Sequence, residues 1–134
     1  MKIYDRIVDG ACFWISTIKF SAHSFQITLS INPTFVKVSG IKLEPCEYGY
    51  RETETKKFDL TDIKTGKCIG RFSVRGNYNN CIYRSGGIPV FIPVFDTKEE
   101  AIEYYNGQIQ NQLDKLTSFY ETKQKYLTKK FVKI

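Results

Sequence analysis

Apolar and polar residues alternate along the first two-thirds of the chain, with the two-residue period of half-buried β-strands. In "FQITLSI" the apolar residues alternate with Gln26, Thr28 and Ser30. "ACFWISTIKF" before it is rich in β-branched and aromatic residues, which favour strands. "TFVKVSG" continues the pattern after Asn32-Pro33, where we expect a turn. These segments predict a sheet.

Two further strand pairs follow. "KKFDLTDI" and "KCIGRFSV" flank "KTG", where Gly66 can take the positive φ of a hairpin turn with a bulge. "RGNYNN" reads as a turn before the strand "CIYR", and a Gly86-Gly87 break precedes the strand "IPVFIPVF". Pro89 and Pro93 have no N–H to donate, so we expect this last strand at an edge of the sheet. "LEPCEYGYRETETKK" has no period and is predicted to be a long loop.

The period changes to that of a helix at "DTKEEA". Asp96 with Glu99, or Thr97 with Glu100, forms a capping box. An amphipathic stripe then recurs every three or four residues: Ile102, Tyr105, Ile109, Leu113, Leu116 and Tyr120. Asn106-Gly107 lies within this stripe and predicts a kink or a break, because glycine costs about 1 kcal/mol in a helix interior.

The fold class that follows is α+β, with an antiparallel sheet of about five to seven strands and a C-terminal amphipathic helix across one face. We expect one domain over residues 1–134, mostly β over 1–95 and helical over 96–130. With 134 residues, 42% of them hydrophobic and 15% aromatic, the chain can bury a core. Its net charge of +6 leans mildly toward an anionic partner.

The start of the chain does not look like a secretory signal, and no apolar run is long enough to cross a membrane. We therefore expect a soluble protein of the cytoplasm with reduced thiols. The four cysteines at issue are Cys12, Cys46, Cys68 and Cys81.

Candidate chemistry is sparse. His23 is the only histidine, there is no Cys-x-x-Cys pair, and the cysteine spacings match no zinc module. "TGKCIG" lacks the earlier glycine and the following Ser or Thr of a phosphate-binding loop. A Cys–His pair could still meet in space. The prediction is nevertheless a non-enzymatic protein with no catalytic residues, no metal site and no cofactor.

Two stretches carry tyrosine and arginine, residue types enriched in the cores of protein interfaces. They are "YGYRETETKK" and "RGNYNNCIYRSGG". Ordinary exposed aromatics would explain them too. As a candidate surface for a partner protein they give Tyr48, Tyr50, Arg51, Arg75, Tyr78, Tyr83 and Arg84.

The end of the chain, "TSFYETKQKYLTKKFVKI", allows three interpretations. Lys98 to Glu121 holds five acids and two bases, whereas Thr122 onward holds five bases and no acid. This asymmetry suits a helix dipole, with Tyr126, Leu127 and Phe131 docking on the sheet. Alternatively, the tail docks on a protein. A third interpretation is nucleic-acid binding through Lys123, Lys125, Tyr126, Lys129 and Lys130.

The chain resembles small accessory proteins of large tailed bacteriophages, in its Lys-, Ile-, Tyr- and Asn-rich composition and in the strand and capped helix of "VFDTKEEAIEYYNGQI". The resemblance implies a protein that binds and inhibits or redirects a host component in the host cytoplasm. Nucleases, transcription machinery and antiviral defence systems such as CRISPR effectors are the usual targets. The apolar strand and aromatic helix also leave a homodimer open.

Overall fold

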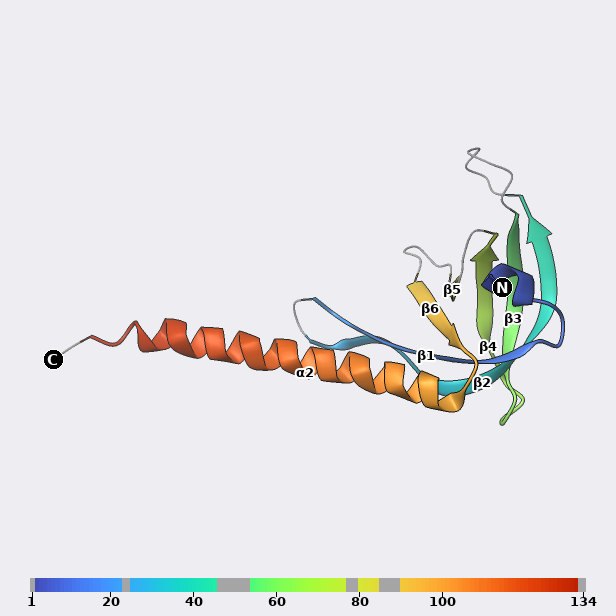
Figure 1. The fold of residues 1–134 in the computed structure, drawn as a ribbon. Helices are drawn as coiled ribbons and strands as arrows, with labels where there is room; N and C mark the ends of the chain where they lie inside the picture. Colours follow the sequence, from blue (N-terminus) through green and yellow to red (C-terminus); the bar gives the residue numbers. More distant parts are fainter. Residues whose placement is uncertain (1, 23–24, 46–53, 77–79, 85–89, 133–134) are drawn as a thin grey trace.

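The computed structural model describes residues 2–22, 25–45, 54–76, 80–84 and 90–132. Six antiparallel strands close into a barrel, in which each strand pairs with the next in sequence and β6 returns to β1 (Figure 1). The strands are β1 (Cys12–Phe20), β2 (Ile27–Glu44), β3 (Thr55–Asp62), β4 (Cys68–Arg75), β5 (Cys81–Arg84) and β6 (Val90–Phe95). A short helix, α1 (Ile3–Arg6), precedes the barrel, and a long helix, α2 (Lys98–Thr128), follows it. The predicted α+β class is confirmed.

The barrel interior is filled by the apolar residues that alternate along the strands. The largest of them are Phe13, Phe58 and Phe72, which are almost completely buried. Helix α1 adds Ile3, and Ile7 follows it into the same core. The Lys56 ammonium fixes this helix by donating hydrogen bonds to the carbonyl oxygens of Tyr4 (2.8 Å) and Ile7 (2.9 Å).

The hairpin of β3 and β4 forms as the sequence predicts. Gly66 has a φ of +73°, and its N–H donates a 2.8 Å hydrogen bond to the Asp62 carbonyl. Glycine adopts a positive φ without steric cost because it has no Cβ, which explains why a glycine stands at this turn.

The predicted turn at Asn32-Pro33 is wrong, because β2 runs through it. The pairing with β1 passes from Ile15–Thr34 to Thr17–Ile31, so Asn32 and Pro33 together face Ser16. Two residues opposite one make a β-bulge, a position where a strand tolerates proline. The result is an 18-residue strand that bends around the barrel.

The prediction of β6 as an edge strand is also wrong. It pairs with β5 through Val90 to Pro93 and with β1 through Val94 and Phe95. Pairing with β1 begins only after Pro93, so that ladder does not require the missing N–H. Closure of the barrel removes both edges of the sheet.

Helix α2 begins at Thr97, the N-cap, whose hydroxyl accepts a 3.2 Å hydrogen bond from the Glu100 N–H. Of the two predicted capping pairs, Thr97 and Glu100 is therefore the one used. The helix continues through Asn106 and Gly107 without a break. Its 31 residues make a rod roughly 46 Å long.

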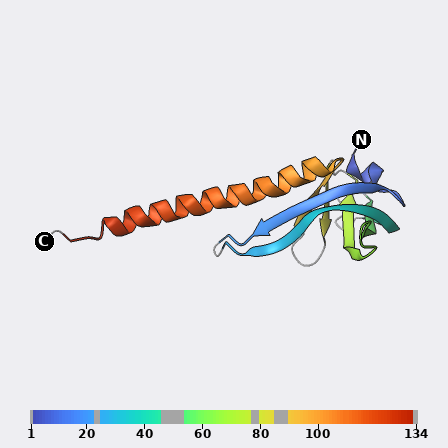
Figure 2. The same cartoon turned by 90° about the horizontal axis from the view of Figure 1, so that it is seen from below.

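Helix α2 packs against β1, β2 and β6, and its contacts reach as far as Phe119, whose ring lies against that of Phe25. The rest of the helix extends past the barrel into solvent (Figures 1 and 2). Residues 120–132 are all exposed. The expectation that Tyr126, Leu127 and Phe131 dock on the sheet is therefore wrong, because the β1–β2 hairpin ends before the helix does.

Candidate functional site

Tyr83 lies at the centre of a small cluster on the outside of the barrel. The Arg75 guanidinium carbon is 5.8 Å from the Tyr83 ring centroid, and the Phe91 and Tyr83 centroids are 6.2 Å apart. Phe91 is 45% exposed. We call Arg75, Tyr83 and Phe91 the aromatic–arginine patch. Three neighbouring strands, β4, β5 and β6, hold it, so its backbone is fixed by the barrel.

Arg75 and Tyr83 of this patch are among the predicted partner-binding residues, whereas Phe91 is not. The signal was present, since Phe91 lies in an alternating apolar segment, but only the cross-strand register places it opposite Tyr83. Arg84 is exposed at the end of β5. Successive side chains on a strand point to opposite faces, so Arg84 is directed away from the face that carries Tyr83.

The other predicted partner-binding residues, Tyr48, Tyr50, Arg51 and Tyr78, lie outside the described residues. Four described residues flank these positions in the sequence: Glu54, Thr55, Arg75 and Gly76. The Gly76 N–H donates a 3.2 Å hydrogen bond to the Glu54 carbonyl, and Thr55 pairs with Arg75. Glu54 and Thr55 therefore lie beside Arg75 and Gly76 at one end of the barrel.

The predicted nucleic-acid-binding residues are all exposed: Lys123, Lys125 and Tyr126 lie on the projecting part of α2, and Lys129 and Lys130 follow its last residue, Thr128. Two lysines lie over aromatic rings, Lys123 at 5.7 Å from the Phe119 centroid and Lys130 at 5.1 Å from that of Tyr126. Phe119 also contacts Phe25 near the end of the β1–β2 hairpin, with ring centroids 5.8 Å apart. Beyond that contact the helix offers its lysines and aromatics to solvent.

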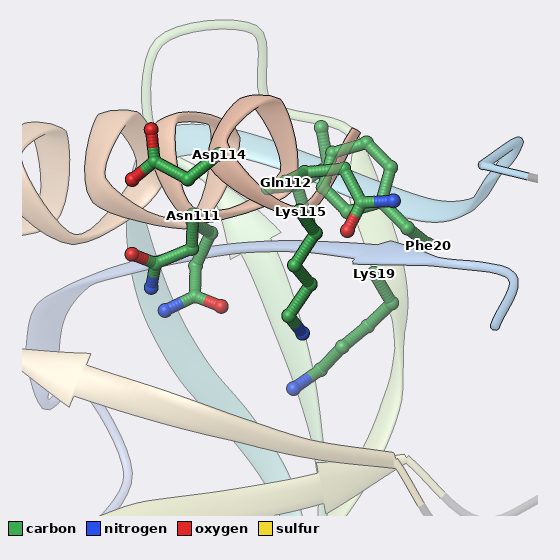
Figure 3. Close-up of a pocket in the computed structure, with 8 residues that line it drawn as sticks. Lys19, Phe20, Asn111, Gln112, Asp114 and Lys115 are labelled. Carbon is green, nitrogen blue, oxygen red and sulfur yellow. The ribbon is translucent and has the colours of Figure 1, made fainter. Parts of the chain in front are cut away.

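A groove of about 320 Å³ lies between α2 and β1, beside the place where the two pack together (Figure 3). The amines of Lys19 and Lys115 reach into it toward one another, whereas Asp114 points away from them. The Gln110 side-chain amide donates a 3.0 Å hydrogen bond to the Asp114 carboxylate. The groove therefore offers ammonium and amide groups for binding. Its lining is Ile18, Lys19, Phe20, Gln108, Asn111, Gln112, Asp114 and Lys115.

Three of the four cysteines lie among the described residues. Cys12, Cys68 and Cys81 are free. Burial raises the pKa of the Cys81 thiol, which disfavours the reactive thiolate. His23 and Cys46 lie outside the described residues. In the part of the chain that the structure describes, no cluster of three His, Cys, Asp or Glu side chains could hold a metal ion.

Comparison with protein families, with curated proteins and with solved structures finds no match in any of the three. Neither helix of the described chain has the length and apolar character needed to cross a membrane.

Proposed function

We propose that this chain is a small non-enzymatic binding protein that docks on a partner protein and inhibits or redirects it by steric occlusion. The aromatic–arginine patch carries the proposal. It combines an arginine, a tyrosine and a half-exposed phenylalanine on three paired strands. These residue types are enriched at the centres of protein interfaces, and a preformed arrangement reduces the entropy lost on binding.

The resemblance to phage accessory proteins directs the choice of partner. In that setting the partner is a host component in the host cytoplasm, such as a nuclease, a transcription factor or an antiviral defence effector. The net charge of +6 favours an acidic face on that partner. Tyr48, Tyr50, Arg51 and Tyr78 remain predicted extensions of the same surface.

The test is a pull-down from bacterial lysate, with and without nuclease, read by mass spectrometry. Wild-type protein is expected to capture a discrete protein that persists after nuclease treatment. Changing Arg75 to Glu and Phe91 to Ala together should abolish that capture while leaving the thermal unfolding midpoint close to that of the wild type. Leu43→Ala is the matched control, because Leu43 is similarly exposed on another strand. Capture that survives the patch changes would rule out this surface.

Nucleic-acid binding is a second candidate, favoured by the exposed lysines and aromatics at the free end of α2. The acidic first half of the helix lies beside the barrel, so a nucleic acid could contact the projecting end alone. Binding should weaken steeply with salt. Changing Lys123, Lys125, Lys129 and Lys130 to Gln should abolish it. Absent or salt-independent binding to single- and double-stranded probes would exclude it.

A further inference from the structure

Part of the apolar surface of α2 follows a seven-residue repeat with core positions a and d; the exposed rings of Phe119 and Tyr126 lie outside it. Position a is Glu99, Asn106, Leu113, Tyr120 and Leu127; position d is Ile102, Ile109, Leu116 and Lys123, and its next member, Lys130, lies just past the end of the helix at Thr128. Six of these ten are apolar or aromatic, and four of the six, Ile109, Leu113, Leu116 and Tyr120, stand at consecutive core positions. Apolar core positions from Ile102 to Leu127, interrupted singly by Asn106 and Lys123, are the pattern of a helix that packs against another helix with isolated polar residues in the contact.

This a/d seam does not face the barrel. At about 100° per residue it lies roughly a quarter turn from the side that carries Ala101, Tyr105 and Phe119. Those three contact the barrel and hairpin, through Ser16, Ser30 and Phe25 respectively. The seam is correspondingly open: Leu113 is 50% exposed, Tyr120 60% and Leu127 56%. Ile109 and Leu116, which also belong to it, are half-buried.

We propose that a second copy of this chain covers the seam, with the two α2 helices antiparallel. In antiparallel pairs an a residue faces a d residue of the other helix. We call each a residue and the d residue that it faces on the other helix a layer. In one register every layer pairs an apolar residue with an apolar one, or a polar residue with a polar one. Leu113 meets the partner's Leu116, Tyr120 meets the partner's Ile109, and Leu127 meets the partner's Ile102. Of the polar pairs, Asn106 faces the partner's Lys123, and Glu99 lies opposite the partner's Lys130, just past the end of that helix.

Shifting the register by one heptad breaks this match. In one direction Leu113 faces the partner's Lys123, and in the other Asn106 faces the partner's Leu116. Each shift places a polar or charged group against a leucine, which costs free energy when the layer is buried. Polar residues at single core positions are known to fix register in this way.

Charge decides between antiparallel and parallel helices. The helix carries five acids and two bases from Lys98 to Glu121, and only bases from Thr122 onward. A parallel pair would bring the lysine-rich ends together, with Lys123, Lys130 and Glu99 each facing its own copy. The antiparallel pair instead lays the basic end of each helix along the acidic start of the other.

Pairing also accounts for the length of α2. Exposed helices shorter than about 12–15 residues are marginal in water, and most helical stability comes from packing of an apolar face. Beyond Phe119 the end of α2 is exposed at every residue. In the antiparallel dimer it lies against the first turns of the partner's helix. The two barrels then stand at opposite ends of the rod, each with its own aromatic–arginine patch.

Light scattering after gel filtration over a concentration series provides the first test. The wild type should elute at about twice its chain mass of 15.6 kDa. Leu113→Glu places a charge in two apolar layers and should raise the dimer dissociation constant at least about 100-fold. Leu43→Glu is the control, because Leu43 is 59% exposed on β2, away from the seam. A wild type that stays monomeric, or a Leu113→Glu variant that stays dimeric, would overturn the proposal.

A charge exchange tests the register without placing a charge in an apolar layer. Glu99→Lys and Lys130→Glu should each weaken the dimer roughly 3- to 10-fold, and the double variant should restore it. A double variant weaker than both singles would refute this register. Small-angle scattering should show an elongated particle, whereas barrels side by side would refute the antiparallel arrangement. The patch lies off the seam, so these outcomes leave the proposed partner-binding function to its own test.

Discussion

The buried Ser16 hydroxyl donates a 2.7 Å hydrogen bond to the main-chain carbonyl of Ala101, 85 residues away. Four successive residues of β1, from Ile15 to Ile18, are buried, because one face of this strand lines the barrel and the other lies beneath α2. Ser16 faces the β-bulge at Asn32 and Pro33. A feature that the sequence presents as a turn thus lies where the long helix is attached to the barrel.

Ser16→Ala is expected to destabilise the protein by about 1 to 2 kcal/mol, because it removes a buried hydrogen bond and leaves a small void. Urea unfolding followed by circular dichroism measures the change. Ser30→Ala is the matched control, since the Ser30 hydroxyl lies 3.0 Å from the Tyr105 hydroxyl at an exposed position. That control should change stability by less than about 0.5 kcal/mol. Equal effects would argue against Ser16 as the principal attachment.

Lys56→Met should loosen α1 from the barrel. The ammonium donates to two main-chain carbonyls and lies 4.2 Å from the centroid of the Tyr4 ring. Loss of these interactions is expected to cost about 1 to 3 kcal/mol, measured by urea unfolding. Lys57→Met is the control, since Lys57 forms a surface ion pair with Glu44 at 2.8 Å. If both variants unfold at the same urea concentration, α1 is not held in this way.

Gly107→Ala is expected to stabilise the helix by about 0.5 to 1 kcal/mol. A Cβ at Gly107 would have no neighbour within 4 Å, and the residue lies in an unbroken helix. Gly66→Ala should do the opposite, because its φ of +73° strains any other residue. Thermal unfolding midpoints of the two variants should therefore move in opposite directions. A lower midpoint for Gly107→Ala would indicate a kink that depends on the glycine.

The sequence predicts the elements whose causes are local. Alternation at "FQITLSI", the positive φ at Gly66 and the cap at Thr97 each depend on residues a few positions apart. The pairing of strands that are far apart in the chain cannot be predicted from such local patterns. Closure of β6 onto β1 depends on Trp14 and Ile15 meeting Phe95 and Val94, far apart in the chain.

The candidate site shows the same division. Residue type was enough to single out Tyr83 and Arg75, but Phe91 joined them only through the register of β5 and β6. The sequence also predicts the apolar stripe of α2, but not which part of the molecule the stripe faces. An apolar stripe indicates that something packs on it, and the stripe alone does not distinguish the barrel from another chain.

The three described thiols should differ in reactivity. Burial raises the pKa of Cys81 above the ordinary thiol value, so less of it is thiolate at any given pH, whereas Cys12 and Cys68 are exposed. Iodoacetamide near pH 8 should therefore alkylate Cys12 and Cys68 several-fold faster than Cys81, read by peptide mass spectrometry. The gap should narrow as the pH rises toward the Cys81 pKa, and disappear in urea, where all three are solvated. Rapid labelling of Cys81 in the native protein would show that β5 opens readily, and with it the centre of the proposed patch.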